Sequence, residues 1–218
     1  MEKKLPSWAA QYPSTMEHTI INVGRQFGSG GKRVASALGA KLGIPVYDNE
    51  LIAEAAEHSG YSRDLFKKSD ERKSVFTLSN IFGTTNRYSV GESYLNDNQL
   101  FKMQSEVIRK IASNGPAIFV GRAADYVLRD MECLDVFISA PIEERRKLVA
   151  EREGISLEAA ETMIIKRDRN RAEYYNFFTF GNWGVASNYD LCVDSSILGI
   201  EGTADFIIDF GRKSGLIK

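Results

Sequence analysis

Few residues in this sequence are of the kinds that stabilise secreted or metal-binding proteins. Among its 218 residues there are two cysteines and two histidines. Cys133 and Cys192 lie far apart with no C-x-x-C spacing, which argues against a disulfide framework and a zinc site. His18 and His58 have no cysteine or carboxylate at metal-ligand spacing, so we expect them on the surface. We interpret both thiols as reduced, buried and inert, as is typical of a cytoplasmic protein.

Long apolar runs and an excess of charge of one sign are also missing. No segment approaches the ~20 apolar residues of a membrane span, and the N-terminus has no apolar run of signal-peptide length. The 28 Lys and Arg residues are balanced by 29 Asp and Glu, for a formal net charge of -1. No overall positive field would therefore attract a nucleic acid polymer or a membrane surface. The absence of G-x-S-x-G argues against an esterase-type nucleophile.

Apolar runs alternate with helical patterns after a polar leader at 1–18. Buried strands are predicted at 19–23, 44–47, 116–122, 134–140 and 189–194. Helices are predicted at 32–42, from 49 onward, and at 99–115, 141–154, 156–178 and 201–213. Such alternation predicts one α/β domain at 19–218, in which a parallel sheet is covered on both faces by helices. Residues 61–98 carry weaker signals, and we expect mobile helices and loops there.

A glycine-rich turn follows the first strand, in the stretch VGRQFGSGGKRV. Gly28, Gly30 and Gly31 would let the backbone curl and aim its N–H groups at an anion, next to a helix N-terminus. The P-loop pattern G-x-x-x-x-G-K-[ST] fits imperfectly in two registers. In one, Gln26 replaces the leading glycine and Arg33 the hydroxyl residue, and in the other Gly31 replaces the lysine. An ordinary glycine turn and a dinucleotide fingerprint are the alternatives, but G-x-G-x-x-G is absent, and we predict phosphate binding.

A second cluster of charge lies in IIKRDRNRAEYY, on the helix predicted at 156–178. Its cations, which outnumber the nearby Asp168 and Glu173, are Lys166, Arg167, Arg169 and Arg171. Helical spacing places Asp168, Arg171 and Tyr175 on one side of the helix. The cluster fits either an anion clamp or an exposed helix laced with ion pairs, which is the usual role of such a run.

Polar side chains also follow two other predicted strands. In FVGRAAD, Arg122 and Asp125 come just after a buried strand, where open α/β sheets bind ligands. Arg122 can hold a phosphate with two hydrogen bonds, and Asp125 can accept from an amino group or a sugar hydroxyl. A loop salt bridge is the alternative for this pair. Asp48 follows the second strand and either belongs to the same edge of the sheet or caps the next helix.

Taken together, these motifs resemble the cytidylate kinase-like group of P-loop phosphotransferases, which is related to bacterial CMP kinases within the nucleoside monophosphate kinase fold. The resemblance covers most of the chain after the leader and is carried by GRQFGSGGKR, VYDNELI, FVGRAADYVL, IKRDRNRAEYY and NWGVASNYDLCVDSSILGIE. It implies a P-loop fold with three α/β/α layers. It further implies small mobile helices that bind the monophosphate at 61–98, a lid with an arginine-rich helix at 150–182, and ATP and Mg²⁺ as cofactors.

The resemblance also assigns roles to individual residues. The loop expected to hold the ATP phosphates comprises Arg25, Gly28, Ser29, Gly30, Gly31, Lys32 and Arg33. The residues expected to bind the acceptor are Asp48, Asn49, Arg122, Asp125, Asp168 and Arg171. Lys32, Arg167 and Arg171 are the expected catalytic cations, because phosphoryl transfer needs charge stabilisation more than covalent help. We expect Asp168 to orient the acceptor rather than to act as a base.

The acceptor site departs from the CMP kinase pattern at several positions. Ala123 stands in place of the aspartate of that family's G-R-D motif, so Asp125 would have to substitute from two residues on. Ile164 and Glu54 stand where CMP kinases have arginines. The segment at 61–98 is shortened and rewritten. The acceptor site is therefore expected to differ from that of CMP kinases.

The loop departs from the pattern as well. Gly31 takes the position of the P-loop lysine, with one extra residue earlier in the loop, so Lys32 or Arg25 must supply the cation. Arg33 fills the position of the hydroxyl that binds magnesium. Ser29 is a candidate replacement, and the metal ligand is left unassigned.

We therefore predict an enzyme that transfers the γ-phosphoryl group of ATP to a small acceptor, with CMP or dCMP as the first choice. One alternative is a kinase that acts on another small phosphoacceptor. The other is a nucleotide-binding sensor with little catalysis. Closure of the lid would exclude water, which competes with the acceptor. The expected partners are nucleotides, without a nucleic acid polymer or a membrane. The composition of the aromatic connector YYNFFTFGNWG is more typical of packing in the core or at a dimer interface than of stacking on a base. A homodimer is therefore one of the alternatives for the assembly.

Overall fold

The computed structural model describes residues 19–52 and 90–218. The expected leader at 1–18, both histidines, Glu54 and most of the variable segment at 61–98 lie outside the described residues. The expectations attached to them stay predictions.

Five parallel strands form one sheet in the order β2-β3-β1-β4-β5. The strands are β1 Ile20–Arg25, β2 Val46–Tyr47, β3 Ala117–Val120, β4 Leu134–Ser139 and β5 Leu191–Asp194. β1 lies at the centre, where Val23 is in register with Val120 of β3 and Val136 of β4. Because every strand runs in the same direction, all the carboxyl ends meet at one edge of the sheet. The parallel α/β sheet predicted from the sequence is confirmed.

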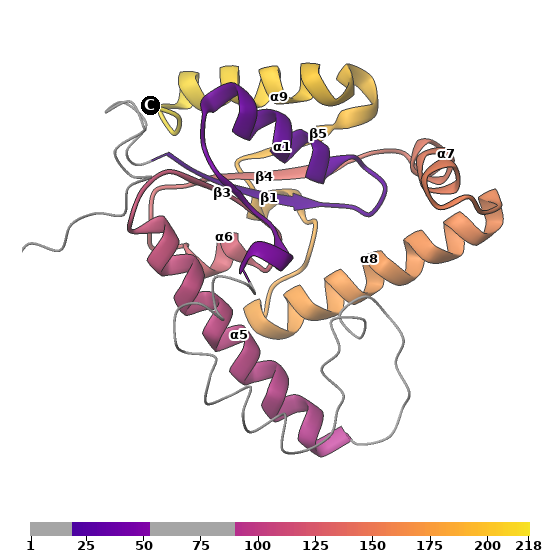
Figure 1. Ribbon diagram of the computed structural model, residues 1–218, viewed down its shortest axis with the longest axis horizontal. Coiled ribbons are helices and arrows are strands. Elements are labelled where there is room, and N and C mark those ends of the chain that lie inside the picture. Colours follow the sequence, from indigo (N-terminus) through magenta and orange to yellow (C-terminus); the bar gives the residue numbers. More distant parts are fainter. Residues whose placement is uncertain (1–18, 53–89) are drawn as a thin grey trace, which may run out of the picture.

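Helices cover both faces of this sheet. They are α1 Gly31–Leu42, α5 Val90–Ala112, α6 Ala124–Val127, α7 Ile142–Glu153, α8 Leu157–Thr179 and α9 Ser195–Ser214, with a 3₁₀ turn at Ala186–Asn188. α1 and α9 lie on one face, and α5 and α6 lie on the other (Figure 1). α7 and α8 form a hairpin that extends to the side of the sheet (Figure 1). The three-layer arrangement is therefore also confirmed.

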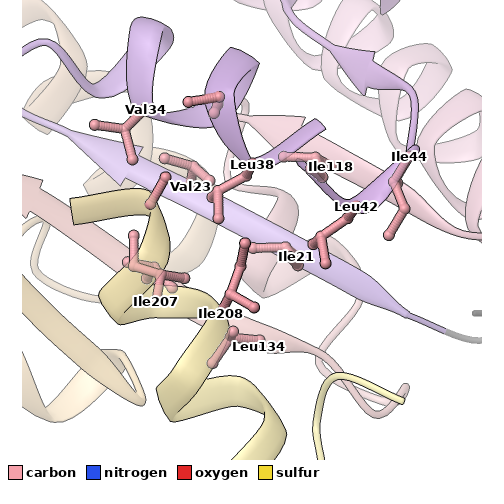
Figure 2. Close-up of a cluster of buried hydrophobic side chains, with 14 of the residues drawn as sticks. Ile21, Val23, Val34, Leu38, Leu42, Ile44, Ile118, Leu134, Ile207 and Ile208 are labelled. Atoms are coloured by element: carbon pink, nitrogen blue, oxygen red, sulfur yellow. The ribbon is translucent and has the colours of Figure 1, made fainter. Parts of the chain in front are cut away.

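Alternating side chains of the central strands explain why the sheet is buried on both faces. Ile21 of β1 packs towards α1 and α9, against residues such as Leu38 and Ile207 (Figure 2). Its neighbour Ile20 points the other way, into a second cluster with Phe119. Successive residues of a strand face opposite sides, so a strand buried on both faces needs an apolar run rather than an alternating pattern. Each such fully buried side chain stabilises the fold by about 1.5–3 kcal/mol.

The two cysteines do not share the buried environment expected from the sequence. Cys192 in β5 is exposed, which corrects that expectation, because β5 is an edge strand and its alternate residue faces solvent. Cys133 is partly buried, and burial raises the pKa of its thiol to about 12, so this thiol stays protonated at neutral pH.

None of the helices in residues 19–52 and 90–218 is long and apolar enough to cross a membrane.

Candidate active site

The glycine-rich turn forms a tight loop between β1 and α1, at the carboxyl edge of the sheet. Gly28 and Gly30 have φ angles of 83° and 75°, a left-handed conformation that favours glycine. Gly31 is the first residue of α1, so the loop leads directly into a helix N-terminus. The orphan N–H groups and the dipole of such an end attract phosphate groups. The structure thus places the predicted phosphate loop where its backbone can bind an anion.

Ser29 holds this loop closed from within. Its side chain donates to the Gln26 carbonyl at 2.9 Å, and its own carbonyl accepts a hydrogen bond from Ser195 Oγ at 2.5 Å. Ser29 is 1% exposed. Its hydroxyl is therefore used inside the loop, and its role as a replacement for the magnesium-bound hydroxyl of the P-loop pattern stays a prediction.

Arg25, at the end of β1, lies at the centre of the site. Gly31 and Gly121 approach its side chain so closely that a methyl group on Gly31 would lie 2.5 Å from Arg25 Cβ, and one on Gly121 would overlap the guanidinium. Burial, together with the neighbouring charges of Arg171 and Arg122, lowers the pKa of Arg25 to about 9. The guanidinium of Arg25 is thus enclosed by the protein and lies near two other cations, Arg122 and Arg171.

Arg122 and Arg171 reach the same place from two other elements. Arg122 follows β3 in a left-handed conformation, with φ 60°, and its guanidinium lies 5.2 Å from the centre of the Tyr174 ring. Arg171 projects from α8 and donates to the Arg25 carbonyl at 2.9 Å. Both predicted phosphate-binding arginines are therefore brought next to the loop.

Lys32 and Asp48 form an ion pair beside the loop, with 2.6 Å between Nζ and the carboxylate. The hydrogen bond to Asp48 raises the pKa of Lys32 above its ordinary value. Although burial favours its neutral form, the bonds from Lys32 and from the Leu51 N–H lower the pKa of Asp48. Asp48 accepts from the Glu50 and Leu51 amides, so it caps the following helix and also lies at the edge of the sheet.

Asn49 and Arg33, two further predicted residues, flank this pair in the sequence. Asn49 Oδ1 is buried and has no hydrogen-bond partner among the described residues, so one polar atom at this edge is unsatisfied. Arg33, the third residue of α1, is exposed to solvent.

Asp168 of α8 anchors the loop, a role that the sequence did not predict. Its carboxylate accepts a hydrogen bond from the Phe27 N–H at 2.6 Å and an ion pair from Arg145 at 2.6 Å. Arg145 of α7 also donates to the Phe27 carbonyl at 3.3 Å. Both backbone groups of Phe27 are thus held by one buried acid–base pair. The expected contact between Asp168 and the acceptor would have to use a carboxylate that is already engaged.

Phe27 itself is surrounded by arginines. The guanidinium groups of Arg152, Arg167 and Arg171 lie 5.1, 5.8 and 5.5 Å from the centre of its ring. Cations near an aromatic face are weakly attracted to it, but three like charges also repel each other. Arg167 and Arg171 were predicted from the sequence, whereas Phe27, Arg145 and Arg152 were missed. The signal available for Phe27 was its place within the glycine-rich loop.

Asp125 lies apart from these groups, which corrects its predicted place beside Arg122. Its carboxylate accepts a hydrogen bond from the Tyr175 hydroxyl at 2.7 Å. Burial raises its pKa above the ordinary value. It lines a cavity of about 280 Å³ together with Tyr126, Arg129, Asp135, Tyr175, Thr179, Gly181 and Asn188. None of these residues belongs to the phosphate loop, because the short helix α6 carries Asp125 away from the edge of the sheet.

The described side chains give little support for a metal ion held by the protein itself. Within the two described ranges, no group of three or more His, Cys, Asp or Glu residues gathers to hold an ion. The arrangement at the loop is instead rich in cations and backbone donors, which suits negatively charged oxygens of a phosphate. Chemically, such a site can hold and neutralise phosphoryl groups.

Known proteins are similar to this chain in sequence and in fold. The model of the cytidylate kinase-like family matches residues 20–197. A cytidylate kinase from Methanopyrus kandleri is 27% identical over 187 residues, which cover 81% of this chain and 84% of that protein. An uncharacterized protein from Eubacterium ventriosum, known from its crystal structure, is 28% identical in sequence to this chain. The two structures have a TM-score of 0.67, and the match covers 90% of this chain and 99% of that one.

A more distant structure shares the fold alone. Shikimate kinase from Acinetobacter baumannii, in complex with shikimate, is 14% identical, with a TM-score of 0.51 over 96% of this chain and 98% of that one. The family match covers most of the sequence and includes the loop, the edge of the sheet and the arginine-rich helix. The chain belongs to the cytidylate kinase-like family of P-loop phosphotransferases.

Proposed function

We propose that this protein transfers the γ-phosphoryl group of ATP to CMP or dCMP. The observation that carries the proposal is the meeting of Arg25, Arg122 and Arg171 beside the phosphate loop. Three guanidinium groups this close repel each other, and an anion among them would relieve that repulsion. The cytidylate kinase of Methanopyrus kandleri, similar along most of the chain, supports the choice of acceptor.

The proposed reaction is a single displacement at phosphorus. An oxygen of the acceptor phosphate forms a bond to the γ-phosphorus, while the bond from that phosphorus to its bridging oxygen breaks. ADP leaves with the electron pair of the broken bond. The attacking oxygen is already anionic, so no residue is needed as a general base. The protein contributes position and charge neutralisation, which supply most of the catalysis in reactions of this class.

Each part of the site has a role in this proposal. The loop amides and the N-terminus of α1 bind the β and γ phosphates of ATP. Arg25 and Arg171 neutralise the charge on the transferring group, with Lys32 and Arg167 as further cations of the site. Arg122 holds the phosphate of the acceptor, because its planar fork suits two parallel hydrogen bonds.

Magnesium enters this scheme as part of the MgATP substrate. Arg33 replaces the usual hydroxyl ligand, Ser29 is turned into the loop, and Asp48 is paired with Lys32. The described residues around the loop therefore do not fit a resident magnesium site. Mg²⁺ is readily bound by phosphate oxygens and water, and it usually keeps several waters.

The lid proposed at 150–182 consists of parts of α7 and α8. Because Asp168 and Arg145 tie Phe27 to this hairpin, the hairpin and the loop position each other. Closure over bound nucleotide would bring Arg152 and Arg167 onto the phosphates and exclude water from the γ-phosphoryl group.

The acceptor is tested by measuring ADP release from MgATP with the purified protein. CMP, dCMP, UMP, AMP, GMP and dephospho-coenzyme A are compared with a reaction that lacks an acceptor. Release that depends on CMP or dCMP supports the proposal, and Arg122→Ala should then raise the KM for that acceptor. Arg212→Ala, an exposed substitution on α9, is the matched control and should behave like the wild type.

A different small phosphoacceptor is the second candidate. The observation in its favour is that Asp125, the expected substitute for the missing aspartate at Ala123, accepts a hydrogen bond from Tyr175. Release of ADP with an acceptor other than CMP or dCMP would select this candidate. If no acceptor stimulates release although ATP raises the Tm of the protein, the remaining alternative is a nucleotide sensor with little catalysis.

A further inference from the structure

The first turn of α1 has no lysine where the P-loop pattern requires one. In that pattern the lysine directly follows the last glycine of the loop and reaches the β and γ phosphates. Here Gly30 adopts the left-handed conformation before the helix, and the next residue, Gly31, is the first of α1. The position of the lysine is therefore occupied by a residue without a side chain.

The space that this side chain would need is filled by Arg25. A Cβ atom on Gly31 would lie 2.5 Å from Cβ and 2.9 Å from Cγ of Arg25. Real atoms do not approach so closely, and both of the opposing atoms belong to the stiff base of the arginine side chain. From there the side chain extends to β3, where its guanidinium packs on the bare backbone of Gly121. Glycine at both positions thus makes room for this one arginine.

The charges around the guanidinium leave it able to bind an anion. Within residues 19–52 and 98–218, Arg25 forms no ion pair with a carboxylate. The nearby carboxylates of Asp48 and Asp168 are paired with Lys32 and Arg145. Lys32, the other candidate cation, is held by Asp48 and has a side chain that is 66% exposed.

We propose that Arg25 replaces the P-loop lysine as the cation that binds the transferring phosphoryl group, delivered from β1 instead of α1. This inference rests on the proposed function, since it names the residue that stabilises the displacement described above. A guanidinium stays charged in the enclosed site and can bind two phosphate oxygens at once. It takes part without proton transfer, by neutralising the oxygens of the γ-phosphoryl group while the bond to ADP breaks.

A swap of side chains tests the proposal. Arg25→Met keeps an unbranched stem against the two glycines but removes the charge, and it should lower kcat/KM about 100-fold or more. Arg25→Gly should lose as much. Gly31→Lys alone should also be impaired, because its Cβ would lie 2.5 Å from Cβ of Arg25. The double variant Arg25→Gly with Gly31→Lys removes the collision, because glycine lacks that Cβ, and restores a cation, so it should be at least about tenfold more active than Arg25→Gly.

Binding of ATP provides a second readout that does not require turnover. ATP should raise the Tm of the wild type and of the double variant, and much less that of Arg25→Met. Circular dichroism before each assay shows whether a variant is folded, and Arg25→Lys serves as a charged variant if Arg25→Gly unfolds. Arg212→Ala is the control for an arginine outside the site.

The outcomes separate this inference from the proposed function. Wild-type protein that transfers no phosphoryl group to any acceptor contradicts the proposed function, whereas the ATP-induced change in Tm still tests Arg25. Wild-type turnover in folded Arg25→Met would overturn the inference, as would a large loss in Lys32→Ala alone. A folded double variant no more active than Arg25→Gly would also overturn it.

Discussion

Replacement of Asp168 by asparagine distinguishes a loop anchor from a substrate contact. Its carboxylate accepts from the Phe27 N–H and from Arg145, both at 2.6 Å, and the side chains of Asp168 and Arg145 are 17% and 10% exposed. A hydrogen bond to a charged group contributes about 1.5–3 kcal/mol, and a charge left buried without its partner costs several more. Asparagine keeps one acceptor oxygen and the site is partly solvated. We therefore expect Asp168→Asn to lower the free energy of unfolding by about 2–4 kcal/mol.

Thermal unfolding followed by circular dichroism measures this loss. Each kcal/mol shifts the Tm of a chain of this size by about 2–4 °C, so a fall of about 4–16 °C is expected. Asp209→Asn, which breaks the exposed ion pair with Lys213, is the matched control and should change stability by less than about 1 kcal/mol. Substitution of Arg145 in the Asp168→Asn background should cost less than in the wild type. An unchanged Tm, together with a raised KM for the acceptor, would refute the anchoring role.

Three further predictions concern the cavity and the acceptor site. Burial raises the pKa of Asp135 to about 6, so the stability that this group contributes at low pH is lost as pH rises from about 4 through about 6. Urea unfolding should therefore show Asp135→Asn gaining stability over the wild type across that range. Tyr175→Phe removes the side-chain donor of the buried Asp125 carboxylate and should lower the urea midpoint by an amount equivalent to about 1–3 kcal/mol. Arg122→Ala should raise the KM for the acceptor more than the KM for ATP, in steady-state assays that vary each substrate.

The sequence predicted the parts of the site that depend on local backbone chemistry. A glycine turn between an apolar strand and a helix can be recognised from the sequence alone, because Gly28 and Gly30 supply the left-handed conformations that other residues avoid. The edge position of Asp48 and Arg122 follows in the same way, since both come directly after buried strands. These residues needed only the order of elements and the rule that parallel strands end at one edge.

The remaining parts depend on packing between distant segments. The choice between Lys32 and Arg25 as the cation was open, because only the close approach of Gly31 and Gly121 reveals which side chain fills the gap. Likewise, the ion pair of Asp168 with Arg145 joins two helices, and neither periodicity nor charge pattern indicates that Phe27 lies between them.

Asp125 shows the limit of reasoning from the end of a strand. Position alone placed it beside Arg122, but α6 begins at Ala124 and turns the next side chain under α8, where Tyr175 binds it. A four-residue helix is too short to leave a periodic pattern in the sequence.

The most direct test of the account follows the phosphoryl group itself. Radiolabel in the γ position of ATP is followed in the presence of the protein and CMP, with dCMP in a parallel reaction, and the nucleotides are separated. The account predicts that label moves to CDP or dCDP in the wild type and that transfer is lost in Arg25→Met. Label that stays on ATP or appears only as inorganic phosphate, with every acceptor tested and with ATP binding intact, would contradict it.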